Sequence, residues 1–330
     1  MKNKTLILSI ILVIVVIGGI YYFVAHQEKL EISKIRVSTN KTPYSTLYVV
    51  AKEKGFFKEE GLDVETVIVG TGREGLDALI SKNVEINFVV DTPMANLGFK
   101  STEVQLVATL AEGLDLDLIV RKDRGINQPS DLKGKKIGIQ KGTVMEFFAS
   151  KFLETNGINK EDVEIQNIGI KEMAVAFERG DFDAVSSFEP HTNKILEMMR
   201  DEAATFSLVI PKVRLVNWNV SVRQEFLENH PVVIKRFLQA LIKAEKYTRD
   251  NKEEVIGIVS QFTEMEKEIL AQIWNKYDLK VVLKNSLLNQ LKDQGEWILE
   301  SEGGGSTLPD YRLLINEKYL KDIAPERVDF

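Results

Sequence analysis

The sequence predicts a two-lobed α/β protein in which each lobe is a mostly parallel sheet flanked by helices, followed by a helical C-terminal region. Three observations lead to this prediction: a long internal repeat, a regular alternation of strands and helices, and a length of 330 residues with 44% hydrophobic content. Strands that alternate with helices are typical of parallel sheets. This length also suffices for two domains with well-filled cores.

The internal repeat begins with residues 34–42 (KIRVSTNKT) and restarts with residues 136–143 (KIGIQKGT). The segments that follow also correspond, since 55–65 is similar to 151–164 and 76–93 is similar to 174–190. A repeat of about 100 residues is too long for a solenoid period, which is usually 20–50 residues. The repeat therefore predicts a duplicated domain with a cleft between the copies.

The first copy reads as alternating strands and helices. Alternating apolar residues predict strands at 35–39, 64–69, 85–90 and 104–110, and helices are predicted at 44–54, at 73–81 and from Asp91 onward. Pro43 stands at the first helical position and Gly55 ends that helix. Right-handed crossovers between these strands give a parallel sheet.

Strands and helices are predicted for the rest of the chain from the same kinds of sequence pattern. In residues 114–120, leucines alternate with Asp115 and Asp117, which predicts a strand with one solvated polar face leading out of the first lobe. A further strand is predicted at 215–222, and from His230 onward only helices are predicted, at 232–250, 253–262, 265–277, 286–300 and 310–323. The expected divisions are 1–26 as a signal anchor or signal peptide, 34–113 as the first part of lobe 1, 114–226 as lobe 2, and 227–330 as C-terminal helices completing lobe 1.

Composition excludes several classes of function. A net charge of -6, with basic and acidic residues interspersed, gives no basic stripe for nucleic acid. The chain has no Cys and only three His, so disulfides, thiol catalysis and zinc sites have no support. We expect no metal and no cofactor, and a monomer.

The N-terminus has a composition of its own. Lys2 and Lys4 precede an apolar run over residues 6–25, about the 20 residues that a bilayer-spanning helix needs. The end of this run has the large Phe23 where a cleavage site would have a small residue, which favours an uncleaved anchor over a cleaved signal. The positive-inside rule keeps the lysines in the cytoplasm and places the rest outside. A cleaved signal would instead leave a secreted or periplasmic protein.

Candidate site residues lie in loops that follow the predicted strands. In open α/β sheets, ligands bind beyond the carboxyl ends of the strands, where helices begin. The candidate residues are Asn40, Tyr44, Thr71, Gly72, Arg73, Asp91, Thr92, Glu112, Thr143, Phe188, Glu189 and Trp218. Facing lobes would bring these loops together around the cleft.

Several candidates also have a purely structural interpretation. Thr71, Gly72 and Arg73 could hold an anionic group or form a capped turn with a solvated arginine. Glu189 could accept hydrogen bonds from a ligand or cap the following helix. Tyr44 and Phe188 could stack on a ring or pack in the core, and Trp218 lies on a return strand near the hinge. His191 is expected to be a surface helix residue.

Four motifs carry a resemblance to a known family. They are residues 48–64 (YVVAKEKGFFKEEGLDV), 131–138 (DLKGKKIG), 180–184 (GDFDA) and 188–190 (FEP). With them the sequence resembles the solute-binding proteins of ABC importers for nitrate, sulfonate, taurine and thiamine-pyrimidine precursors, from about residue 35 to the C-terminus. The resemblance implies a type II periplasmic-binding-protein fold that closes on a small solute by a hinge and docks on the transmembrane subunits of a permease. We expect hinge segments near 111–114 and 222–228.

The acids among the candidates bear on the ligand. Asp91, Glu112 and Glu189 near one cleft would repel nitrate or a simple sulfonate unless Arg73, Lys41 or Lys141 outweighs them, since unpaired buried charges are costly. An amino-bearing solute such as a taurine-like zwitterion or an aminopyrimidine is therefore favoured. The alternatives are a nitrate or alkanesulfonate binder, a membrane-tethered sensor, and an enzyme resembling the pyrimidine synthases of thiamine biosynthesis. The enzyme would need a cysteine-rich segment that this chain lacks.

Overall fold

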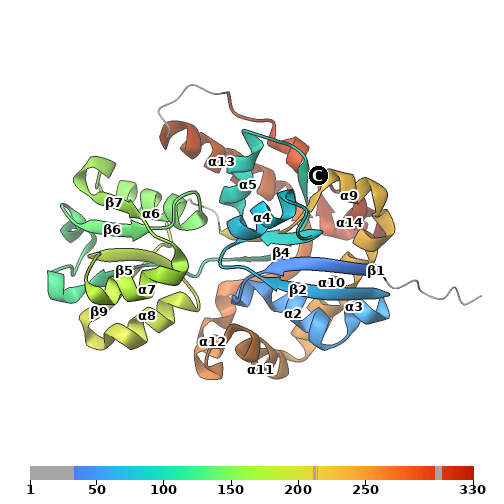
Figure 1. Cartoon of the computed structure of the whole chain (residues 1–330), viewed down its shortest axis with the longest axis horizontal. Coiled ribbons are helices and arrows are strands. Elements are labelled where there is room, and N and C mark those ends of the chain that lie inside the picture. Colours follow the sequence, from blue (N-terminus) through green and yellow to red (C-terminus); the bar gives the residue numbers. More distant parts are fainter. Residues whose placement is uncertain (1–32, 211–212, 214, 302–306) are drawn as a thin grey trace, which may run out of the picture. The chain divides into compact units, whose positions relative to one another are not determined.

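The computed structural model describes residues 33–210, 213, 215–301 and 307–330. Within these residues the strands form two sheets (Figure 1). The seven-stranded sheet has the order β12-β11-β4-β10-β3-β1-β2, and the five-stranded sheet has the order β7-β6-β8-β5-β9. We call each sheet with the helices that pack on it the first lobe and the second lobe, respectively. This arrangement confirms the predicted two-lobed α/β fold.

The strands of the two sheets have the following bounds. The seven-stranded sheet contains β1 (Ser33–Thr39), β2 (Leu62–Ile68), β3 (Ile86–Val89), β4 (Val104–Gly113), β10 (Val216–Arg223), β11 (Tyr277–Lys284) and β12 (Val328–Asp329). The five-stranded sheet contains β5 (Leu116–Arg121), β6 (Lys136–Ile139), β7 (Glu164–Asn167), β8 (Ala184–Phe188) and β9 (Ala203–Ser207).

Helices cover both sheets (Figure 1). The first lobe carries α2 (Thr46–Glu53), α3 (Phe56–Glu59), α4 (Gly72–Ile80), α5 (Asp91–Gly98), α9 (Gln224–Asn229), α10 (Pro231–Asp250), α11 (Lys252–Thr263), α12 (Lys267–Ile273), α13 (Asn285–Ser301) and α14 (Lys318–Ile323). The second lobe carries α6 (Val144–Thr155), α7 (Ile170–Arg179) and α8 (His191–Met199). Within the described ranges, none of the helices combines the length and the apolar character needed to span a bilayer.

The internal repeat reappears as a repeated strand order. In the first sheet the neighbours run β10-β3-β1-β2, and in the second they run β5-β8-β6-β7. β1 pairs with β3 in parallel, as β6 does with β8, and the strand beyond each pair, β10 or β5, is antiparallel. The parallel strands are thus the repeated part of the fold, and the antiparallel strands come from the segments that connect the lobes.

Aromatic side chains fill the core of the first lobe between the sheet and its helices. Phe57 of α3 stacks on Phe237 of α10 at 5.0 Å, and Tyr48 of α2 meets the edge of Phe88 at 5.1 Å between ring centroids. All four side chains are buried. This packing fixes α2 and α10 against the sheet, so that β1 and β3 end at a firm edge where the pocket forms.

Two predictions about the later part of the chain are wrong. Only helices were expected from His230 onward, with Tyr277 at the end of one, but residues 277–284 form β11. Tyr277, Val281 and Leu283 are buried while Asp278 and Lys280 are exposed, the alternation of a strand on a sheet surface. Residues 216–223 form β10 and pair with β3 and β4, so they belong to the first sheet and not to lobe 2 as expected. The chain therefore returns between β9 and β10, before the expected hinge segment at 222–228.

A buried aspartate links α5 to β10 by hydrogen bonds. Asp91, at the first position of α5, is completely buried and accepts a hydrogen bond of 2.9 Å from the Asn217 backbone N–H. The side-chain amides of Asn217 and Asn219 donate to it as well, and Asn219 accepts from Thr109 of β4. Burial raises the pKa of Asp91 to about 7, although the hydrogen bonds oppose the shift.

This raised pKa predicts a specific effect of pH on stability. Because the folded protein holds the Asp91 proton more tightly than the unfolded chain, the contribution of Asp91 to stability is lost as pH rises from about 4 to about 7. Asp91→Asn cannot ionise, so its melting temperature should rise relative to that of the unmodified protein over this pH range and stay level above it. A difference between the two melting temperatures that does not vary with pH would contradict the assignment.

Candidate functional site

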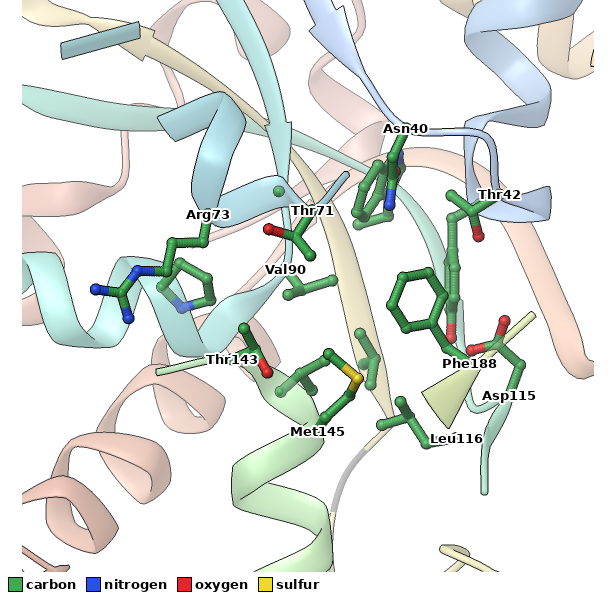
Figure 2. A pocket seen from close by; sticks show the side chains of 16 residues that line it. Asn40, Thr42, Thr71, Arg73, Val90, Asp115, Leu116, Thr143, Met145 and Phe188 are labelled. Carbon is green, nitrogen blue, oxygen red and sulfur yellow. The ribbon is translucent and has the colours of Figure 1, made fainter. Parts of the chain in front are cut away.

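A small pocket lies where loops from both lobes meet (Figure 2). Its volume is about 40 Å³, room for about three water molecules at 10–15 Å³ each. It is lined by Asn40, Thr42, Tyr44, Thr71, Gly72, Arg73, Val90, Pro93, Asp115, Leu116, Thr143, Val144, Met145, Phe188, Val216 and Trp218. These residues follow β1, β2, β3 and β6, end β8, or stand on or between the strands that connect the lobes. The loops after the parallel strands are where the rule for open α/β sheets places a ligand.

Aromatic rings form one wall of the pocket. The rings of Tyr44 and Trp218 are tilted against each other with centroids 5.9 Å apart, and Tyr277 meets Tyr44 edge-on at 4.9 Å. Phe188, at the end of β8, adds a ring from the second lobe. Such a wall offers a flat apolar surface with few polar atoms.

Asp115 is the carboxylate that lines this pocket. It stands between β4 and β5 and is only 2% exposed, and its Oδ2 accepts a hydrogen bond of 2.8 Å from the Tyr277 hydroxyl. Burial raises the pKa of Asp115 to about 6, against the effect of the Tyr277 hydrogen bond. A buried carboxylate of this kind favours a donor or a positive charge on a ligand.

The predicted solvated face of residues 114–120 is therefore wrong. β5 lies between β8 and β9 in the sheet, and both Asp115 and Asp117 are buried. Burial raises the pKa of Asp117 as well. The alternation of leucine and aspartate arises because the aspartates face the region between the lobes instead of solvent.

Several polar atoms of the pocket have no hydrogen-bond partner among the described residues. They include Asn40 Oδ1, Thr42 Oγ1 and Trp218 Nε1, and these three side chains are at least nine-tenths buried. Buried polar groups without partners are rare and costly, so such groups mark a place for a ligand or for ordered water. The pocket thus offers both acceptors and a donor in addition to the Asp115 carboxylate.

Two helices begin at the opposite side of the pocket. α4 starts at Gly72 after Thr71, and α6 starts at Val144 after Thr143. The Thr71 hydroxyl accepts from the Glu74 N–H at 3.4 Å, whereas the Thr143 hydroxyl donates to the Gln140 carbonyl at 2.6 Å. Helix N-termini favour negative charge because their first N–H groups and the helix dipole point outward.

Arg73 turns away from the interior of the pocket. Its side chain is exposed, and Nη1 donates to the backbone carbonyl of Lys141 at 3.3 Å. Figure 2 shows the guanidinium extending to the side opposite Asp115. In this conformation the arginine binds the second lobe and does not face the centre of the pocket.

Glu189 lies beside the pocket without lining it. It is 6% exposed, and its Oε2 accepts from the Asn193 N–H of α8 at 3.3 Å, which is the capping role considered as its alternative. Burial, with Asp115 as the next cause, raises the pKa of Glu189 to about 7. His191, expected at the surface, is half-buried with its ring against Phe188 at 5.3 Å, and burial lowers its pKa to about 4.

Three other candidates are also placed outside the pocket lining. Asp91 is held by Asn217 and Asn219, Thr92 is completely buried, and Glu112 pairs with Lys284 at 3.4 Å. Sequence reasoning missed Thr42, Asp115 and the apolar lining residues. Asp115 was expected on a solvated strand face, and apolar residues carry no chemical signature that would distinguish a pocket from the core. Among the described residues, no cluster of three or more potential metal ligands occurs.

The chain is similar in sequence to proteins that are named for binding small solutes. A protein of Bacillus subtilis (strain 168) named for the binding of aliphatic sulfonates is 24% identical over 312 residues, which is 90% of each chain. The taurine-binding periplasmic protein of Escherichia coli (strain K12) is 25% identical over 228 residues, 68% of each chain.

Solved structures share the fold at lower identity. The alkanesulfonate-binding protein of Xanthomonas axonopodis pv. citri bound to MOPS superposes with a TM-score of 0.75 at 14% identity, covering 87% of this chain and 99% of that one. A desulfurization enzyme has the same fold, with a TM-score of 0.66 at 13% identity, covering 89% and 99%. The model of the family described as NMT1/THI5 like matches residues 42–255, more than half of the chain, and the protein therefore belongs to that family.

Proposed function

We propose that the protein is the solute-binding component of an ABC importer, which captures a small polar solute between its lobes and delivers it to a permease. The pocket supports this proposal because residues of both lobes line it and its buried polar atoms lack partners. The relatives named as binding proteins support the same role. With a volume of about 40 Å³ the pocket is contracted, so the lobes must separate to admit a solute.

The observation that carries the choice of solute is the separation of two unlike ends of the pocket. Asp115 lies at one side, and Thr71 and Thr143, which precede the starts of α4 and α6, lie at the other (Figure 2). A carboxylate suits an amino group, and helix N-termini suit an oxyanion. We therefore propose an aminosulfonate of the taurine type as the solute, with an aminopyrimidine as the other amino-bearing possibility.

The second candidate is an oxyanion without an amino group, such as nitrate or an alkanesulfonate. The two helix N-termini and the name of the Bacillus relative favour it. Asp115 opposes it, because an ionised buried carboxylate repels a second anion unless a cation stands between them. Arg73 does not fill that place, since its guanidinium binds the Lys141 carbonyl.

A matched pair of solutes tests the proposal. Taurine should raise the melting temperature more than ethanesulfonate, which lacks only the amino group. Asp115→Asn should weaken taurine binding about 10- to 150-fold, because a hydrogen bond to a charged group contributes about 1.5–3 kcal/mol. Calorimetric titration of the purified protein measures both affinities.

Asp63→Asn is the control for this experiment, since Asp63 is an exposed acid on β2 outside the pocket. Its affinity for taurine should equal that of the unmodified protein. The amino-bearing solute would be the wrong choice if ethanesulfonate or nitrate alone stabilised the protein and Asp115→Asn bound it as tightly as before.

We further propose that the protein is not an enzyme and acts as a monomer outside the cytoplasm, attached to the membrane through residues 6–25. These residues lie outside the described part of the chain, and their composition alone supports the anchor. Membrane fractions should contain the intact chain, whereas a soluble form that begins near His26 would exclude the anchor. The test is fractionation followed by N-terminal sequencing.

A further inference from the structure

Two neighbouring residues of α4 reach across to the second lobe. Arg73 donates from Nη1 to the Lys141 carbonyl at 3.3 Å, and Glu74 Oε2 lies 4.0 Å from Lys171 Nζ. Lys141 precedes α6 and Lys171 stands in the first turn of α7. One helical turn of the first lobe therefore contacts two separate segments of the second, the loop before α6 and the first turn of α7.

Glycines make room for both of these side chains. Gly142 has a φ of +71°, and a Cβ there would lie 1.7 Å from Arg73 Nη1. At Gly70 a Cβ would lie 3.1 Å from Lys171 Cε, a side chain from the opposite lobe. Each lobe thus has a glycine, which lacks a side chain, at the point where a charged side chain of the other lobe packs against it.

Further charges of opposite sign face each other beside these contacts. A larger chamber of about 520 Å³ adjoins the pocket at Asn40, and its charged lining comprises Lys41, Glu264 and Glu266 from the first lobe and Lys171, Lys194 and Glu197 from the second. Lys41 and Lys194 both lower the pKa of Glu264, so the field of the second lobe reaches this acid. Both signs of charge therefore occur on each side of the chamber, and the attraction of Glu264 to Lys194 acts across it.

We propose that Arg73 and Glu74, with Lys141, Gly142 and Lys171, form a charged clasp that favours the closed arrangement of the lobes and makes closure depend on ionic strength. The clasp rests on the proposed function, since closure around a solute is the step that it would regulate. Its ion pair is exposed, with side-chain exposures of 69% for Lys171 and 42% for Glu74. Exposed pairs are weak and are screened by salt, so the clasp biases closure without locking it.

The clasp can be tested on the full-length protein without any solute. The chain has no cysteine, so Lys58→Cys in α3 and Lys122→Cys beside β5 place one spin label on each lobe. Double electron–electron resonance on the protein in detergent then reports the distances between the lobes. Glu74→Gln should raise the ratio of open to closed molecules about 1.5- to 5-fold, the range for an exposed ion pair.

Charge reversal provides a stricter test. Glu74→Lys should open the lobes further, and adding Lys171→Glu should return the distances toward those of the parent. Glu74 also accepts a hydrogen bond from the Gly70 N–H at 3.0 Å, and the double reversal does not restore that bond. Recovery in the double variant would therefore come from the charge pair itself.

Salt and a matched variant complete the design. Raising the ionic strength from about 0.01 to about 1 M shortens the screening length from about 30 to about 3 Å, which should open the parent and change Glu74→Gln less. Glu225→Lys is the control, because it breaks an exposed pair with Lys82 within the first lobe. Unchanged distances in Glu74→Lys, or no recovery in the double reversal, would overturn the clasp. Taurine binding is measured in a separate experiment. A failure of the clasp can therefore be distinguished from a failure of the proposed function.

Discussion

The burial of Asp115 at the first crossing between the lobes is the constraint on which the rest of the site depends. The chain leaves β4 at Gly113 and enters β5 at Leu116, and the aspartate between them is almost completely buried. Tyr277 stabilises it by a hydrogen bond, and the Tyr44 and Trp218 rings stand beside it. A carboxylate in such surroundings lowers the affinity for anions and raises the affinity for hydrogen-bond donors.

The charged side chains near the pocket fall into two groups. Some contact the opposite lobe, and others line the interior of the pocket. Arg73, the cation that could neutralise an anionic solute, is directed to the Lys141 carbonyl. The interior then depends on helix N-termini and hydroxyl groups to bind the negative end of a solute. Neighbouring residues of one helical turn thus have different surroundings, with Thr71 and Gly72 lining the pocket and Arg73 and Glu74 contacting the other lobe.

Much of this architecture could be predicted from the sequence, because the duplicated strands and the loops after them follow local patterns. Asn40, Thr71 and Thr143 line the pocket for that reason. β11 could not be predicted in this way, since it pairs with β4 more than 160 residues earlier and stands among helices. The burial of Asp115 and the direction of Arg73 were also out of reach, because alternation within a strand does not tell a solvated face from one covered by a second lobe.

Proton exchange on binding tests the central claim, that a buried carboxylate receives the amino group of the solute. Calorimetric titrations near pH 6, where Asp115 titrates, should be repeated in two buffers of different ionisation enthalpy. A cationic group beside Asp115 favours the ionised carboxylate, so taurine binding should release protons to the buffer. Uptake of protons on binding, as expected when an oxyanion enters beside a carboxylate, would contradict the account.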